Sequence, residues 1–309
     1  MIYLDNAATT QIDKRVLDAM MPYLTTQYGN AGTLYKFGRS AGEAVKQARA
    51  QVAEFLNAKP EQILFTSGGS EANSLVFQGL KEYLKSIGKT HILVSAIEHD
   101  SVLKAAHSLI KDEFYIEYLP AHSDGKVFVQ SVEDAITPKT GLVSVMYVNN
   151  ETGAVNPIEE IGTICMKRGI LFHTDAVQAF CQVPIDVDEC NIDMLSSSGH
   201  KINGPKGIGF LYIRKGVKIR SFVHGGAQER KRRAGTENVP GIVGYGLAAE
   251  RAMKNMKERT EKEIELRDYL INRLTTEIPY SRLNGDRVKR LPNNVNVSFQ
   301  FIEGESMLL

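Results

Sequence analysis

The chain has 309 residues, of which 43% are hydrophobic and 24% charged. These proportions are those of ordinary globular proteins and exclude a disordered or fibrous chain. Its 37 basic and 36 acidic residues leave a formal charge of +1, which is too small to recruit nucleic acid or an anionic membrane through a bulk field. The length fits one large α/β domain and a smaller second domain.

The amino terminus and the cysteines indicate a cytoplasmic protein. The opening residues MIYLDNAATT contain no basic leader followed by an apolar core, and no stretch approaches the roughly 18 apolar residues of a membrane-spanning helix. Cys165, Cys181 and Cys190 form no CxxC motif and no metal-binding spacing. Because unpaired cysteines are usual in a reducing compartment, we expect neither disulfides nor a metal site.

Short apolar runs between helix-like segments predict a mostly parallel sheet. Apolar residues recur at helical spacing over residues 45–56 and 75–84. The expected strands are residues 63–65, 92–94, 143–148, 170–172 and 209–213. Strands that alternate with helices in this way are typical of a layered α/β domain whose helices cover the sheet.

The carboxyl-terminal part of the sequence predicts a second domain. A Gly/Ala-rich start and a charged run over residues 238–278 predict one long helix that leaves the large domain. Alternating apolar residues in the segment 295–299 predict a strand, and the closing GESMLL resembles the capped first turn of a helix. We therefore expect a large domain over residues 15–255 and a small α+β domain, incomplete at its carboxyl end, made of residues 1–14 and 256–309.

The first candidate for chemistry is the segment TSGGSE, residues 66–71, which follows an apolar run and opens a helix. Glycines let backbone amides approach a phosphate, the hydroxyls add donors, and the helix N-terminus favours an anion. Serine and glycine also cap ordinary helices, so this segment alone leaves both interpretations open.

The second candidate is Asp175, which ends an apolar run. Open α/β sheets bind ligands at the carboxyl ends of their strands, where a carboxylate can keep a pyridine nitrogen protonated and so turn the ring into an electron sink. Gln178, three residues later, would face the same side in a helical turn. An aspartate that merely caps a helix is the alternative.

The third candidate is Lys201, which lies in SSGHKINGPKG, a turn rich in serine and glycine after an apolar run. Beside a ligand, and partly desolvated, a lysine amine has a lowered pKa and becomes nucleophilic. Most lysines are simply solvated, so the neighbouring motifs carry this assignment.

Two further groups follow other expected strands. His99, in AIEHD, can stack on a flat cofactor and transfer protons near neutral pH, or can serve as a surface or cap residue. Asn150, in NNETG, brings an amide to the same edge of the sheet, although the segment also suits a plain turn. Together, five strand ends offer groups that match the phosphate, ring nitrogen, ring hydroxyl, ring face and aldehyde of pyridoxal phosphate.

The motifs LDNAATT, TSGGSEAN, EHDSV, VNNETG, HTDAVQ, SSGHKINGPKGIG and RRAGTENV, in this order, resemble those of the cysteine desulfurases, a group of the class V aminotransferases. The resemblance extends from Leu4 to Ser306. It implies pyridoxal-phosphate fold type I, with a three-layer large domain and a mostly parallel sheet. It also implies pyridoxal 5′-phosphate as cofactor and L-cysteine as substrate, which is converted to L-alanine while its sulfur passes to an acceptor.

The resemblance assigns roles to individual residues. Lys201 would form the Schiff base with the cofactor and His99 would stack on its ring, which makes these two the expected catalytic residues. Asp175 would pair with the ring nitrogen. The other expected cofactor-binding residues are Gln178 and Asn150 on the ring-hydroxyl side, Gly69, Ser70, Ser198 and His200 at the phosphate, and Thr236, which would reach the phosphate of a neighbouring subunit. A homodimer is therefore expected.

A basic run at residues 230–233 lies beside Thr236. Four basic residues make a small footprint for nucleic acid. We therefore expect no nucleic-acid ligand, and expect the run to serve the subunit interface instead.

The sequence departs from the family at its carboxyl end. Family members continue into a loop with a cysteine nucleophile and an arginine for the substrate carboxylate, and we expect the chain to be truncated before this loop. Cys165, Cys181 and Cys190 match no such motif and are expected to be structural.

The leading hypothesis is thus a cysteine desulfurase that lacks its nucleophilic segment, with a sulfur-acceptor or iron–sulfur scaffold protein as partner. One alternative is a catalytically silent dimer that only binds the cofactor. The other is a different pyridoxal-phosphate enzyme, an aminotransferase or lyase, whose reaction needs no thiol.

Overall fold

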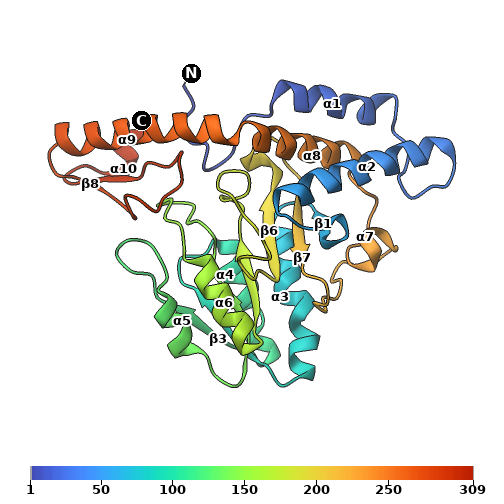
Figure 1. The fold of residues 1–309 in the computed structure, drawn as a ribbon, viewed down its shortest axis with the longest axis horizontal. Coiled ribbons are helices and arrows are strands. Elements are labelled where there is room, and N and C mark those ends of the chain that lie inside the picture. Colours follow the sequence, from blue (N-terminus) through green and yellow to red (C-terminus); the bar gives the residue numbers. More distant parts are fainter. Residues whose placement is uncertain (1, 309) are drawn as a thin grey trace.

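The computed structural model describes residues 2–308 and has a seven-stranded sheet at its centre (Figure 1). The strands, in spatial order, are β1 (Ile63–Thr66), β7 (Gly209–Ile213), β6 (Met194–Ser198), β5 (Leu171–Asp175), β4 (Thr140–Ser144), β2 (His91–Ser95) and β3 (Tyr115–Leu119). Strand β7 runs antiparallel to both of its neighbours, and every other pair in this sheet is parallel. The prediction of a mostly parallel, layered α/β fold is confirmed.

The five expected strands are present, one of them displaced. Two strands of the sheet, β3 and β6, were not among them, and three of the five residues of β6 are serines. The apolar run at residues 143–148 lies only partly in β4, which ends at Ser144. Beyond it, single backbone hydrogen bonds from Val145 and Tyr147 continue along β5. Strand β3 was not predicted, because it lies at the edge of the sheet and its exposed positions interrupt the apolar run.

The two faces of the sheet bury separate hydrophobic clusters. In β1, Ile63 and Phe65 pack on one face and Leu64 on the other, since successive side chains of a strand alternate. The helices that contribute to the first cluster are α1 (Lys14–Thr25), α2 (Lys36–Phe55), α5 (Val129–Ala135), α6 (Ile158–Arg168) and α8 (Val239–Lys254). Those on the second face are α3 (Gly69–Ser86) and α4 (Asp100–His107). This arrangement gives the three layers that the resemblance implied.

The long helix predicted for residues 238–278 is wrong as a single element. Helix α8 ends at Lys254 and α9 spans Met256–Glu277, with Asn255 between them at φ −101° and ψ 4°. The two helices have different surroundings, because α8 packs an apolar stripe against the sheet whereas α9 is largely exposed. A continuous helical period in the sequence does not reveal such a break.

A second, two-stranded antiparallel sheet follows α9 and consists of β8 (Ser281–Leu283) and β9 (Val297–Phe299). The strand predicted within residues 295–299 is therefore confirmed for its second half, and α10 (Gly304–Leu308) fits the expected terminal turn. In Figure 1 these elements lie beside α9, away from the large sheet. The division into domains stays a prediction, and its end residues Met1 and Leu309 lie outside the described part of the chain.

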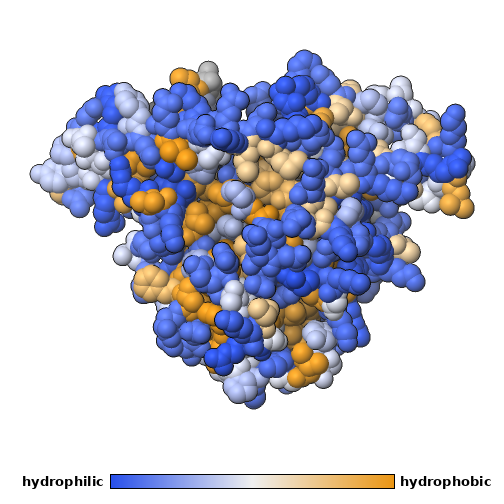
Figure 2. All heavy atoms as spheres, in the orientation of Figure 1, coloured by the Kyte–Doolittle hydropathy of each residue, from blue (hydrophilic) through white to orange (hydrophobic). Residues whose placement is uncertain are grey.

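The surface seen in Figure 2 is mostly hydrophilic, with apolar side chains gathered in patches. Within residues 2–308, no helix is both long and apolar enough to cross a bilayer. A group of exposed apolar side chains belongs to α1, the start of α2 and the loop between them: Leu17, Met21, Leu24, Tyr28, Leu34, Tyr35 and Phe37.

Candidate active site

A cavity of about 520 Å³ lies where the carboxyl ends of the parallel strands meet the N-terminus of α3. Nine of the ten predicted site residues line it: Gly69, Ser70, His99, Asn150, Asp175, Gln178, Ser198, His200 and Lys201. Thr236 is exposed and does not line it. Short motifs that are far apart in the sequence therefore meet at the edge of the sheet, where open α/β folds bind ligands.

One end of the cavity is suited to an anion. Gly68 precedes α3 with φ +153°, a conformation that favours glycine. A Cβ atom on Gly69 would lie only 2.8 Å from Cγ2 of Val177, so the chain passes too closely here for a side chain. The first amides of α3 have no acceptor within the helix, and the hydroxyls of Ser70 and Ser198 border the same space. Such a set of donors fits a phosphate group.

Arg233 and Glu71 form an ion pair behind this anion site. Arg233 Nε donates to Glu71 Oε1 at 2.8 Å, and Glu71 Oε2 accepts from the Ser67 amide at 2.8 Å. Burial raises the pKa of Glu71, but the hydrogen bonds from Arg233 and Ser67 outweigh it and leave the pKa below its ordinary value. In the same basic run, Arg230 donates to the Ile63 carbonyl at 2.6 Å. Two of the four basic side chains are thus bound within the chain.

Asp175 ends β5 and is buried, with 5% of its surface exposed. Its Oδ1 accepts from the Val177 amide at 2.9 Å and its Oδ2 from Asn73 Nδ2 at 2.7 Å. Burial raises the pKa of Asp175, although these two hydrogen bonds and the positive charge of Lys201 oppose the change. A cationic group bound in the cavity would stabilise the carboxylate further.

Lys201 follows β6 in a short 3₁₀ turn (Gly199–Lys201) and is partly buried. Its Nζ donates to the carbonyls of Ala7 and Ala8, the latter at 3.0 Å. Burial lowers the pKa of Lys201, and the nearby carboxylates of Asp175 and Asp5 only partly oppose it. The amine is therefore more available as a nucleophile than that of a solvated lysine.

The amino-terminal segment closes one side of the cavity along the Lys201 turn. The Thr10 amide donates to the His200 carbonyl at 2.9 Å, and the Asn203 amide donates to Thr10 Oγ1 at 2.8 Å. Gln178 Nε2 donates to the Ala7 carbonyl at 2.9 Å. The contribution of backbone carbonyls to the site was missed from the sequence, because a carbonyl leaves no signature in the residue types.

His99 caps α4, is exposed and lines the cavity. Its Nδ1 accepts from the Ser101 amide at 3.1 Å and lies 2.8 Å from Ser101 Oγ. His99 is therefore a helix cap that also lines the site, and its stacking on a cofactor stays a prediction. Asn150 also lines the cavity, while its neighbour Asn149 holds the turn through three hydrogen bonds to Oδ1.

The three cysteines lie away from this cavity. Cys165 and Cys181 are buried, and burial raises the pKa of Cys165 to about 12. Cys190 is partly buried and lines a second cavity. The prediction that they are structural agrees with their burial, because a buried thiol with a raised pKa is a poor nucleophile.

The residues present fit pyridoxal phosphate. An anion site, a buried carboxylate, an imidazole and an amine of lowered pKa surround one cavity, and the group needs a partner for its phosphate, its ring nitrogen, its ring face and its aldehyde. This is the architecture of a pyridoxal-phosphate enzyme of fold type I. A family model described as aminotransferase class-V matches residues 2–309, and the chain belongs to this family, whose members use pyridoxal 5′-phosphate.

Within the family, the chain belongs to the cysteine desulfurases. Cysteine desulfurase IscS of Methanosarcina thermophila is 49% identical over 308 residues, which cover 100% of this chain and 76% of that protein. The IscS protein of Clostridium botulinum strain Hall is also 49% identical, over 310 residues that cover 78% of its length. Among solved structures, a NifS-like protein has a TM-score of 0.95 at 37% identity, covering 99% of this chain and 84% of that one. A structure of SspA in complex with cysteine has a TM-score of 0.87 at 40% identity, covering 97% and 84%.

Proposed function

We propose that this protein converts L-cysteine to L-alanine with pyridoxal 5′-phosphate bound at Lys201, and passes the sulfur to a thiol. In the overall reaction, L-cysteine and a thiol give L-alanine and a persulfide, so the C–S bond breaks and an S–S bond forms with no other reactant. The observation that carries the proposal is the meeting of Lys201, Asp175 and the N-terminus of α3 in one cavity. The related SspA structure with cysteine supports the choice of substrate.

The cofactor, when bound, supplies an electron sink that weakens the bonds at Cα and Cβ of an amino acid. We assign its phosphate to the amides at the start of α3 with Ser70 and Ser198. Its ring nitrogen is assigned to Asp175, and its ring hydroxyl side to Gln178 and Asn150. We also assign His200 to the phosphate. It lies next to Lys201, and its Nδ1 forms a hydrogen bond with Thr9 Oγ1 at 3.1 Å.

Two groups of the chain are available to move protons. Lys201 Nζ can take the proton from the substrate Cα in its unprotonated form, which burial favours by lowering the pKa. His99 lines the same cavity and is the second group that can donate a proton there. The hydrogen bonds to both Asp175 oxygens hold that carboxylate still while these transfers occur.

The thiol that receives sulfur is, in this proposal, supplied from outside the described residues. Within residues 2–308, no cysteine lines the cavity around Lys201. A cysteine of another segment, a sulfur-acceptor protein or an iron–sulfur scaffold protein would each provide the thiolate that the reaction requires. Without such a thiol, we expect the residues described here to bind L-cysteine but to release little sulfide.

A homodimer is part of the proposal. Thr236 is exposed and does not line the cavity, so it is free to contact a neighbouring subunit. The exposed apolar side chains of α1 and α2 form a surface of the kind that subunits cover. A cytoplasmic location also stays a prediction.

The first test maps the cofactor. The protein is incubated with pyridoxal 5′-phosphate, reduced with borohydride, digested and examined by mass spectrometry, and we expect the label on Lys201. A label on a different lysine would contradict the proposed site. In a separate, unreduced sample of the protein with pyridoxal 5′-phosphate, L-cysteine is added with and without a small thiol. We expect L-alanine production to depend on the thiol.

A further inference from the structure

The side-chain amide of Asn73 links two groups of the proposed site. Asn73 lies on α3 and is fully buried. Its Nδ2 donates to Asp175 Oδ2 at 2.7 Å and to Ser101 Oγ at 2.9 Å. The amide nitrogen carries two hydrogens, and each of these two bonds uses one of them.

Ser101 transmits this contact to His99. Its Oγ accepts from Asn73, so the hydroxyl hydrogen is free to point at His99 Nδ1, which lies 2.8 Å away. The Ser101 amide donates to the same Nδ1 at 3.1 Å. With two donors directed at Nδ1, this nitrogen is an acceptor, and the neutral ring carries its hydrogen on Nε2.

The orientation of the Asn73 amide is set by Asp175. A flipped amide would bring its oxygen against the Asp175 carboxylate, where two acceptors would repel each other. In the observed orientation Asn73 Oδ1 is buried and has no partner among residues 2–308. A buried acceptor without a partner lowers stability. This orientation therefore keeps the two hydrogen bonds of Nδ2 but leaves Oδ1 without one.

We propose that Asn73 is a positioning residue of the active site, which orients the Asp175 carboxylate directly and fixes the His99 ring through Ser101. The inference rests on the proposed function, because Asp175 and His99 are assigned there to the ring nitrogen and the ring face. It adds that a single side-chain amide of α3 fixes the orientation of both Asp175 and His99. The sequence signal was weak: Asn73 lies three residues after Ser70, and so shares its face of α3.

The same two helices provide a matched control. Gln78 of α3 donates to the hydroxyl of Ser108, just after α4, at 2.8 Å. This bond joins the same elements as the bond from Asn73 to Ser101, but neither Gln78 nor Ser108 lines the cavity around Lys201. Ser108→Ala therefore reports on the loss of an interhelical hydrogen bond alone.

The first experiment reads the His99 ring directly by nuclear magnetic resonance. The ring nitrogens of the seven histidines are labelled with ¹⁵N in the cofactor-free protein, and the His99 signals are assigned by their loss in His99→Gln. We expect Nε2 to resonate as a protonated nitrogen and Nδ1 as an unprotonated, hydrogen-bonded one. Ser101→Ala and Asn73→Leu should shift the Nδ1 signal, Ser101→Thr should restore it, and Ser108→Ala should leave it unchanged.

The second experiment uses the loaded enzyme with L-cysteine and an added thiol. Loss of these side-chain hydrogen bonds at the site predicts a fall in kcat of about 2- to 10-fold in Ser101→Ala and Asn73→Leu, with KM little changed. Ser101→Thr should recover kcat, and Ser108→Ala should match the parent protein. Thermal unfolding of each variant shows whether it is folded, and Ser101→Ala carries the test if Asn73→Leu is not.

Identical His99 nitrogen signals in Ser101→Ala and the parent protein would overturn the inference. An equal change in Ser108→Ala would also overturn it, since the effect would then belong to helix packing. The proposed function fails differently, through the absence of a Lys201 label or of alanine in the parent protein. The two failures are therefore distinguishable, because the ring signals are measured without cofactor or substrate.

Discussion

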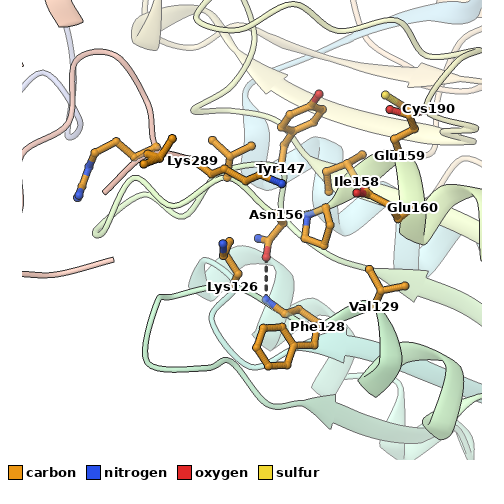
Figure 3. Close-up of a pocket in the computed structure, with 15 residues that line it drawn as sticks. Lys126, Phe128, Val129, Tyr147, Asn156, Ile158, Glu159, Glu160, Cys190 and Lys289 are labelled. Carbon is orange, nitrogen blue, oxygen red and sulfur yellow. Dashed lines mark hydrogen bonds between the residues drawn. The ribbon is translucent and has the colours of Figure 1, made fainter. Parts of the chain in front are cut away.

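Two cavities of this protein have the same volume, about 520 Å³ each, but differ in chemistry. The first contains Lys201. The second lies between α6, the residues that follow β4 and the loop before β9. Its lining includes Lys126, Tyr147 and Cys190 (Figure 3). Volume alone therefore does not distinguish the two cavities.

The two cavities differ in the surroundings of their lysines, Lys126 and Lys201. Burial lowers the pKa of both, but Lys126 forms ion pairs with Asp124 at 3.0 Å and with Asp286 at 2.5 Å, and these raise its pKa above the ordinary value. Lys201 has carboxylates nearby but bonds to backbone carbonyls, and its pKa stays lowered. The ion pairs therefore stabilise Lys126 as a cation, whereas burial makes Lys201 easier to deprotonate than a solvated lysine.

The largest expected difference comes from removing each lysine. Lys201→Ala should abolish the borohydride label and reduce alanine formation by at least about 1000-fold, because it removes both the covalent anchor and a general base. Lys126→Ala should keep the label and nearly all activity. Liquid chromatography of alanine and mass mapping of the label measure both effects, and retained labelling in Lys201→Ala would break the comparison.

Asp175→Asn is the next largest effect. The amide cannot stabilise a protonated ring nitrogen by charge, and loss of a charge-assisted bond corresponds to about a 10- to 100-fold decrease in kcat. Cofactor should still bind through its phosphate and Lys201. Turnover close to that of the parent protein would remove Asp175 from its assigned role.

Glu98, near Asp175 of the first cavity, tests how stability depends on pH. It is buried beside Asp175, and burial raises its pKa well above 4.5. Because the folded state holds this proton more tightly than the unfolded state, stability contributed by Glu98 is present below pH 4.5 and is lost as pH rises through the raised pKa. Glu98→Gln should remove that loss, so the variant should lose less stability than the parent protein as pH rises. Urea unfolding from pH 4 to 8 measures it, with parallel curves for both proteins as the contrary result.

Asp286 should give the opposite sign at the second cavity. Its hydrogen bond to Lys126 helps to lower its pKa to about 2 from 3.8. The stability that it contributes is therefore present above pH 3.8 and is lost as pH falls through about 2. Asp286→Asn should cost about 1 kcal/mol at neutral pH, allowing for solvent screening, and nothing near pH 2. An equal loss at both pH values would show that packing and not charge is responsible.

The smallest effect is expected for Cys190→Ser. Its thiol lies in the second cavity, and burial raises its pKa, so it should take no part in sulfur transfer. Sulfide release and alanine formation should equal those of the parent protein. A large loss of sulfide in this variant would make Cys190 the nucleophile and would join the two cavities in one reaction.

What the sequence could predict depends on how local the signal is. Lys201, His99 and the segment before α3 each lie in a short motif whose glycines, hydroxyls and position after a strand indicate their surroundings. The contacts of Asn73 could not be predicted, because they depend on how α3 packs on β5 and α4. The break at Asn255 was also missed, since both sides of it have helical periodicity and only their burial differs.

The bond from Lys201 to the carbonyl of Ala7 joins residues 194 positions apart. A ribosome adds about 5–20 residues per second, so Ala7 is added to the chain roughly 10 to 40 s before Lys201. Throughout this interval the LDNAATT segment has no Lys201 turn to bind, and the first residues made are among the last to reach their final contacts. Cofactor capture during synthesis would therefore have to wait for the second half of the large sheet, and the oldest part of the nascent chain would close the site.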